Sequence, residues 1–211
     1  MSLRFDSTRQ RLYDAAGHRY DPVTRAWVAD DRATGAPIDV VDAATWLQRS
    51  SGHPWRVPVG VIGPRAATDA QMRTAEAVGQ GLARMGFTIL CGGRDGVMTA
   101  VAKGARSAGG TTVGLLPETD ASVANAYIDI AIATGIGEAR NALIARASLC
   151  LVAVGNSHGT LSEVALSRHF GKLVIGLDHA AEVDGVRHVA DAAAALRLVA
   201  RFAVGRLEAA D

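Results

Sequence analysis

A strand pattern followed by a helix pattern recurs along this chain from residue 57 onward, and this recurrence constrains the fold most. Near-continuous apolar runs, such as Leu149 to Val154, indicate strands that are covered on both faces, as in a parallel sheet. Right-handed crossovers then predict a doubly wound, Rossmann-like α/β fold with ligands at the carboxyl ends of the strands. We expect strands at 57–62, 87–91, 111–116, 128–133, 149–154 and 173–178, and helices at 68–85, 96–108, 137–148, 160–170 and 190–203.

The first 55 residues differ in composition from the rest. They hold all three tryptophans and two of the three tyrosines. Short apolar pieces alternate there with glycine and Asp-Pro turn signals, which predicts a small β-meander, followed by a short helix over 41–49. We therefore divide the chain into an amino-terminal extension, 1–55, and a Rossmann-like nucleotide-binding domain, 56–211. A segment this short cannot bury its aromatic residues internally, so we expect it to pack against the main domain or a second subunit. A lid over the ligand is the less favoured alternative.

Composition and charge narrow the class of protein. With 211 residues, 49% of them hydrophobic, the chain can bury a sizeable core, which argues against disorder. A net charge of +1 disfavours a nucleic-acid partner. Arg4, Asp6 and Arg9 interrupt any secretory signal, and no apolar run is long enough to span a bilayer. We therefore expect a cytoplasmic protein without a membrane partner.

Cysteine and histidine usage predicts no metal site, and we expect no resident cofactor. Cys91 and Cys150 both fall in predicted strands, which indicates buried, reduced thiols. The histidines lack the close spacing of zinc ligands, and the cysteines are far apart in the sequence.

The strongest site signal is the stretch from Gly155 to Glu163, between a predicted strand and a predicted helix. A glycine-containing turn before a helix points backbone N–H groups, and the positive end of the helix dipole, into one small space. A phosphate would bind there, and Glu163 adds a carboxylate for acid/base chemistry. The residues that we expect to contact the phosphate-bearing ligand are Asn156, Ser157, His158, Gly159 and Thr160.

Three further strand ends carry candidate ligand residues. After the first strand, Gly63 allows close backbone approach, and Arg65 either reaches a phosphate or is solvated. The turn that follows the strand expected at 128–133 is not a full dinucleotide fingerprint, because the third glycine of that fingerprint is missing. The turn after the second strand, which is either a ligand loop or a tight strand–helix turn, contributes Gly92, Gly93, Gly96 and Met98. The turn after the strand expected at 128–133 contributes Gly137, Arg140 and Asn141.

Arg140 and Glu163 each have a structural as well as a chemical interpretation. Thr160 to Glu163 matches a capping box, in which Glu163 would reach back to the cap N–H. Arg140 could form a surface ion pair. Both residues nevertheless follow predicted strands in the first turns of helices, so both should point at the same edge of the sheet.

These motifs resemble those of the Lonely Guy proteins, phosphoribohydrolases often mislabelled as lysine decarboxylases. The resemblance covers Cys91 to Leu177, with the strand from Val57 to Gly63 as its first strand. The family's Gly-Gly-Gly-x-x-Gly-Leu-Met, Arg-Lys and Pro-Gly-Gly-x-Gly-Thr-x-x-Glu motifs are matched by residues 92–98, 140–141 and 155–163. The resemblance implies a Rossmann-like fold, a homodimer or higher oligomer, and a catalytic pair at Arg140 and Glu163.

Two departures place the chain nearer a sister branch. Gly155-Asn156-Ser157 stands where the family has Pro-Gly-Gly, and Asn141 replaces a lysine and removes a positive charge. An Arg-Asn pair resembles the branch that includes the molybdenum-cofactor carrier protein, whose members bind a phosphate-bearing ligand.

Two functions therefore remain open. One is hydrolysis of the N-glycosidic bond of a nucleoside 5′-monophosphate, which releases the base and ribose 5-phosphate; there Glu163 would stabilise the oxocarbenium-like transition state or activate water. The other is a non-catalytic carrier for molybdenum cofactor or another phosphorylated pterin or nucleotide, which needs the anion site but no catalytic carboxylate.

Overall fold

Residues 2–30 and 34–207 are described by the computed structural model of the chain, and they form two compact units. The first unit combines residues up to Trp55 with residues 197–207, and the second spans residues 56–196. The division falls inside the last helix, α6 (Ala192–Ala203), whereas the sequence assigns that whole helix to the larger domain.

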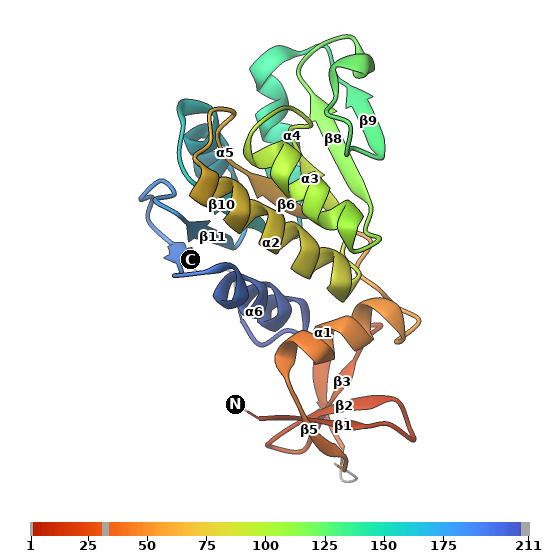
Figure 1. The fold of residues 1–211 in the computed structure, drawn as a ribbon. Helices are drawn as coiled ribbons and strands as arrows, with labels where there is room; N and C mark the ends of the chain where they lie inside the picture. The colour runs from red at the N-terminus through yellow and green to blue at the C-terminus, as the bar shows by residue number, and fades with distance from the viewer. Residues whose placement is uncertain (1, 31–33, 208–211) are drawn as a thin grey trace. The chain divides into compact units, whose positions relative to one another are not determined.

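The second unit contains a seven-stranded sheet in which every neighbouring pair of strands is parallel. The strand order is β12-β11-β10-β6-β7-β8-β9 (Figure 1). The predicted α/β class with a doubly wound, mostly parallel sheet is confirmed. The strands are β6 (Val59–Ile62), β7 (Ile89–Cys91), β8 (Thr112–Leu116), β9 (Ile130–Ala133), β10 (Leu151–Val154), β11 (Val174–Leu177) and β12 (Val186–His188).

Helices cover both faces of this sheet. Helices α2 and α3 pack against each other on one face, and α4 and α5 pack against each other on the opposite face (Figure 1). The central strands β6, β7, β10 and β11 are therefore buried along their whole length, as their apolar sequences predict. The helices are α2 (Asp69–Met85), α3 (Val97–Ser107), α4 (Asn141–Ala147) and α5 (His158–His169), with short 3₁₀ segments η1 (Ala121–Val123) and η2 (Gly137–Arg140).

The strand order reverses between β6 and β10, and this reversal positions the functional site. From β6 the chain adds strands on one side of the sheet, and from β10 it adds them on the other side. The loops that leave these two neighbouring strands diverge to opposite faces and leave a crevice beyond the strand ends. The crevice thus lies between the turn at Gly63 and the turn at Gly155.

The sequence misses one strand and misplaces one helix. Residues 186–188 form β12, although this short edge strand is half-exposed and lacks an apolar run. The segment expected to be helical from 137 begins as the 3₁₀ turn η2 and becomes α-helical only at Asn141. Cys91 and Cys150 are buried and free, as predicted.

The first unit contains a five-stranded antiparallel sheet in the order β4-β3-β2-β1-β5, followed by helix α1 (Val40–Arg49). This arrangement fits the predicted meander and helix. Tyr13 and Tyr20 are fully buried, and Phe5 packs its ring against that of Trp46. The strands are β1 (Leu3–Asp6), β2 (Arg11–Asp14), β3 (His18–Asp21), β4 (Ala26–Ala29) and β5 (Ala36–Ile38).

Hydrogen bonds tie the end of α6 into this first unit. The Tyr20 hydroxyl and the Trp55 indole N–H donate to the carbonyl of Ala203 at 3.2 and 3.0 Å. The Trp27 indole N–H donates to the carbonyl of Val204 at 2.8 Å. These bonds satisfy carbonyls at a helix end, which otherwise lack intrahelical partners. In the portion of the chain that the structure covers, no helix is long and apolar enough to cross a membrane.

Candidate functional site

A cavity of about 720 Å³ lies at the carboxyl ends of β10, β6, β7 and β8. Its walls come from the loops that follow these four strands and from η2 and the start of α4, which follow β9. The cavity therefore occupies the crevice where the strand order reverses. Of the residues proposed from sequence, Gly63, Arg65, Gly92, Met98, Arg140, Asn141, Asn156, Ser157, His158, Gly159, Thr160 and Glu163 line this cavity.

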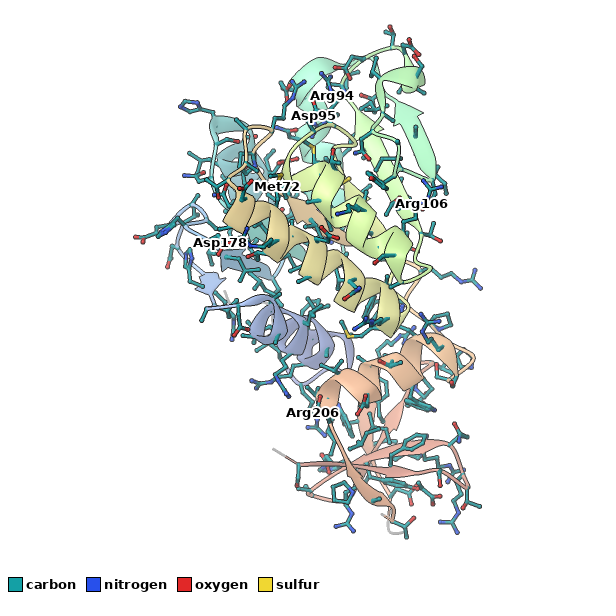
Figure 2. The ribbon with its side chains drawn as sticks, viewed as in Figure 1. Met72, Arg94, Asp95, Arg106, Asp178 and Arg206 are labelled. Carbon is teal, nitrogen blue, oxygen red and sulfur yellow. The ribbon has the colours of Figure 1, made fainter. Side chains whose placement is uncertain are left out.

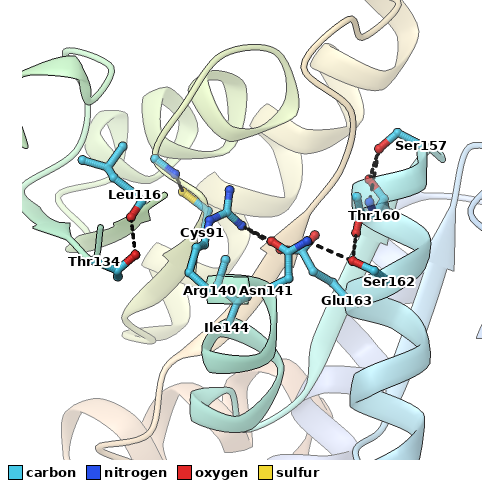
Figure 3. Close-up of polar contacts among 12 residues, drawn as sticks. Cys91, Leu116, Thr134, Arg140, Asn141, Ile144, Ser157, Thr160, Ser162 and Glu163 are labelled. Carbon is cyan, nitrogen blue, oxygen red and sulfur yellow. Dashed lines mark hydrogen bonds and ion pairs between the residues drawn. The ribbon is translucent and has the colours of Figure 1, made fainter. Parts of the chain in front are cut away.

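One end of the cavity is formed by the amino terminus of α5. Ser157 is the N-cap residue, and its hydroxyl accepts a hydrogen bond from the backbone N–H of Thr160 at 3.1 Å (Figure 3). The helix begins at His158, two residues earlier than the sequence predicts, because Ser157 supplies the cap. The N–H groups of this first turn therefore open beside the cavity, and together with the helix dipole they favour an anion there.

The capping-box interpretation of Glu163 is wrong. With Ser157 as N-cap, the third helical residue is Thr160, and Glu163 lies in the second turn of α5. The Glu163 carboxylate instead accepts a hydrogen bond from Nη1 of Arg140 at 3.1 Å. Both residues are only 6% exposed, so this is a buried contact between the two side chains rather than the surface ion pair considered for Arg140.

Asn141 extends this pair into a short polar network. Nη1 of Arg140 also donates to the Asn141 side-chain oxygen at 2.6 Å, and the Asn141 amide donates to the Ser162 hydroxyl at 2.9 Å (Figure 3). Asn141 therefore holds the guanidinium against Glu163. The Nε atom of Arg140 is buried and has no hydrogen-bond partner in the described part of the chain.

Burial changes the acidity of the paired carboxyl group. It raises the pKa of Glu163 to about 8, although the adjacent Arg140 guanidinium opposes part of that rise and the carboxylate of Glu138 adds to it. Near neutral pH the group thus has a large protonated fraction and can donate as well as accept a proton. Such a perturbed carboxyl group in a cleft is a common mark of a functional site.

Gly92 is required at its position because Arg140 fills the space beside it. A Cβ atom at residue 92 would lie 2.7 Å from Nη2 of Arg140 and 2.7 Å from the sulfur of Met98. The glycine loop after β7 therefore lets the guanidinium reach Glu163 across the sheet edge.

Three residues proposed from sequence do not line the cavity. A Cβ at Gly93 would approach Leu116, and one at Gly96 would come within 2.4 Å of backbone oxygens in the loop after β6, so both glycines permit close packing beneath the site. Gly137 has a positive φ of 59° and begins η2, a turn function that the sequence pattern alone cannot separate from ligand contact.

The cavity also contains residues that the sequence analysis missed. Pro64, Ala66, Glu138 and Ser162 lie within or next to the stretches already singled out, so their positions could have been included. Ile62 and Pro117 are apolar residues at strand ends, and Arg94 lies between two glycines that were chosen; none of the three carries a recognisable motif signal. The complete set of cavity residues that the sequence analysis missed is Ile62, Pro64, Ala66, Arg94, Pro117, Glu138 and Ser162.

Among residues 2–30 and 34–207, no three His, Cys, Asp or Glu side chains cluster in a way that could hold a metal ion. The polar groups of the cavity include backbone N–H donors, hydroxyls, side-chain amides, an imidazole, guanidinium groups and two carboxyls. This set suits an organic ligand with an anionic end, the kind of ligand that binds at the strand ends of a doubly wound α/β protein.

Comparison with known proteins specifies the family. The sequence profile of the SLOG cluster4 family matches residues 56–201, and the chain belongs to that family. The molybdenum cofactor binding protein of Rippkaea orientalis is 34% identical; the match covers 68% of this chain and 96% of that protein, with a TM-score of 0.63. The molybdenum cofactor carrier protein of Chlamydomonas reinhardtii is 37% identical; the match covers 72% of this chain and 100% of that protein, with a TM-score of 0.65.

An uncharacterised protein of Archaeoglobus fulgidus is 40% identical over 129 residues, which are 61% of this chain and 85% of that protein. The predicted resemblance, including its placement near the carrier branch, is confirmed. The family match begins at residue 56, so the amino-terminal 55 residues lie outside it.

Proposed function

We propose that this protein binds and carries a phosphorylated heterocyclic ligand of the molybdenum-cofactor type. The observation that carries the proposal is the cavity over the amino terminus of α5, in a chain similar over almost the whole length of proteins described as binding or carrying molybdenum cofactor. The phosphate would lie against the first turn of α5, where Ser157 and the backbone N–H groups meet it.

The pairing of the charged groups also favours a carrier. Glu163 is held by Arg140, which Asn141 holds in turn, so neither side chain can take part in a reaction without breaking this network. A carrier needs a pocket that binds its cargo without altering it. Molybdenum cofactor would be cargo here, and its phosphate would bind at the first turn of α5.

Calorimetry tests the anion site directly. AMP should bind measurably and adenosine should bind much more weakly, because only the nucleotide carries the phosphate for α5. Equal affinity for the two would contradict a phosphate-anchored site. For the carrier role, protein loaded with molybdenum cofactor should restore activity to a cofactor-free molybdoenzyme. Mass spectrometry of ligands retained through purification would then identify the natural cargo.

A second function, hydrolysis of a nucleoside 5′-monophosphate, is favoured by one observation. A carboxyl group with a raised pKa lies in the cavity beside an arginine, as an acid that protonates a departing base would. The protonated Glu163 carboxyl would give its proton to the departing base nitrogen as the bond from that nitrogen to the ribose carbon breaks. Water would add to the same carbon and lose a proton to the Glu163 carboxylate, which restores the acid. The wild-type protein should then release free base from a monophosphate, and Glu163→Gln should not. Absence of base release by the wild type would exclude this function.

We also propose that the protein is a homodimer or higher homo-oligomer. Large apolar side chains are exposed along consecutive elements of the second unit, from β9 to α4. These are Ile130, Ile132, Ile136 and Leu143, which are 43–51% exposed. A second copy that covers them would remove apolar surface from water. Light scattering should give at least twice 21.9 kDa at micromolar concentration, and a monomer mass would contradict the proposal.

A further inference from the structure

Arg94 is a cavity residue to which neither the motifs nor the proposed phosphate site assigns a role. It follows β7, and its backbone is fixed by neighbouring side chains. The Asn125 amide donates to the Arg94 carbonyl at 2.8 Å, and the Thr99 hydroxyl donates to the same carbonyl at 3.1 Å. The Arg94 side chain is 19% exposed, and it lines the cavity. Figure 2 shows its loop at the carboxyl-end edge of the sheet, above α3.

The guanidinium of Arg94 is oriented but not saturated. Its Nη1 pairs with the carboxylate of Glu118, which holds one corner of the group. In the described parts of the chain, no other group accepts a hydrogen bond from this side chain. Since a guanidinium carries five N–H donors, the Nε and Nη2 edge remains available to a ligand.

The position of Arg94 relative to α5 defines the length of that ligand. Arg94 follows β7 and α5 follows β10, and only β6 lies between these strands. Two strand spacings separate the two ends by roughly 10 Å. Ile62, Met98 and Pro117 contribute apolar wall to the cavity. The cavity therefore offers an anion site at one end, an apolar wall for a flat ring, and a fork of donors at the other end.

We propose that Arg94 recognises the ring carbonyl of an oxo-substituted heterocycle whose phosphate lies at α5. Arginine pairs well with a carbonyl oxygen beside a ring nitrogen, as on the O6 and N7 edge of guanine. An amino group at the same ring position would face the arginine with a donor instead of an acceptor. Pterins and 6-oxopurines share the carbonyl, whereas adenine has the amino group. This inference rests on the proposed phosphate site and specifies the ring class of the ligand.

Inosine monophosphate and AMP are the matched probes, because the carbonyl and the amino group at the 6-position distinguish their rings. Calorimetry on the full chain should show that the wild type binds inosine monophosphate about tenfold or more tightly than AMP. Arg94→Lys keeps the charge but loses the planar fork. It should reduce the affinity for inosine monophosphate to about that for AMP and should change the affinity for AMP much less.

Arg106→Lys is the control, since Arg106 lies on α3, donates to the Ala126 carbonyl and does not line the cavity. It should change neither affinity. Equal wild-type affinities for the two nucleotides would overturn the inference but leave the phosphate site standing. An equal fall in the affinities for both nucleotides in Arg94→Lys would have the same meaning. If neither nucleotide binds to the wild type, the proposed phosphate site itself is wrong. The wild-type preference tests the inference even if Arg94→Lys fails to fold.

Discussion

Arg140 and Glu163 show what individual residues reveal before a structure is known. Their positions after two strands predict that they meet at one sheet edge, and they do, at 3.1 Å. The depth of their burial could not be predicted, because it depends on the packing of α4 against α5. Local sequence also could not distinguish Glu163 from a capping residue, since Thr160 offers the same spacing as a true N-cap.

The raised pKa of Glu163 predicts an unusual dependence of stability on pH. In the unfolded chain the carboxyl group of Glu163 has its ordinary pKa of 4.5, whereas in the folded chain its pKa is about 8. Between these values the folded state binds the extra proton, so the free energy of unfolding falls as pH rises. The slope is at most about 1.4 kcal/mol per pH unit.

Glu163→Gln should remove this slope, because the amide resembles the protonated carboxyl and can still accept from Arg140. Urea unfolding followed by circular dichroism at pH 5, 6, 7 and 8 measures the difference. Relative to the wild type, the variant should become progressively more stable as pH rises. Parallel stability curves for the two proteins would show that Glu163 is ionised in the folded state throughout this range.

At the scale of secondary structure, the sequence predicts all strands of the parallel sheet except β12, and the main helices of the second unit. Apolar runs predict buried strands regardless of their partners, so β10 and β11 were predictable. The half-exposed β12 was not, because its pairing with β11 comes from the tertiary fold rather than from local propensity. Arg94 was missed for a related reason, since its place in the cavity follows from strand order.

The cap of α5 links helix geometry to anion binding, and two substitutions separate these roles. Ser157→Ala removes the acceptor for the Thr160 N–H and should cost about 1 kcal/mol of stability. Ser157→Asp retains a capping oxygen, so stability should stay near that of the wild type. The new carboxylate would nevertheless occupy the anion site, so AMP binding should be lost.

Urea unfolding and AMP calorimetry on both variants provide the measurements. The alanine variant acts as the control for the aspartate variant, because it loses the cap without adding charge. Undiminished AMP binding by Ser157→Asp would show that the phosphate lies elsewhere in the cavity.

At the scale of the whole molecule, the sequence separates the first 55 residues by composition but does not reveal that the end of the chain completes their unit. Residues 203 and 204 contribute only backbone carbonyls to Tyr20, Trp27 and Trp55, and backbone acceptors leave no sequence signal. Arg206 adds an ion pair with Asp14 and lies over the Trp27 ring, with its guanidinium carbon 3.5 Å from the ring centroid.

Asp14 is the more deeply buried member of the ion pair with Arg206. Burial opposes its ionisation, but hydrogen bonds from His18 and Arg206 outweigh that effect and lower the pKa of Asp14 to about 2. The carboxylate is therefore charged at neutral pH and depends on these partners. Removing Arg206 would leave Asp14 with its hydrogen bonds from Ala16 and His18. We therefore expect the loss to be about 1.5–3 kcal/mol, the scale of one hydrogen bond to a charged group.

A chain that ends at Ala203 should therefore lose stability in its first unit and keep its ligand site. The truncation leaves α6 complete but removes the Val204 acceptor of Trp27 and the Arg206 partner of Asp14. All three tryptophans lie in the first unit, so tryptophan fluorescence reports its unfolding alone. The urea midpoint by fluorescence should fall, whereas AMP affinity should not change, because the cavity residues lie between 62 and 163. Full-length Arg206→Ala should reproduce most of the loss. An unchanged midpoint in both proteins would mean that residues 2–55 fold without the chain end.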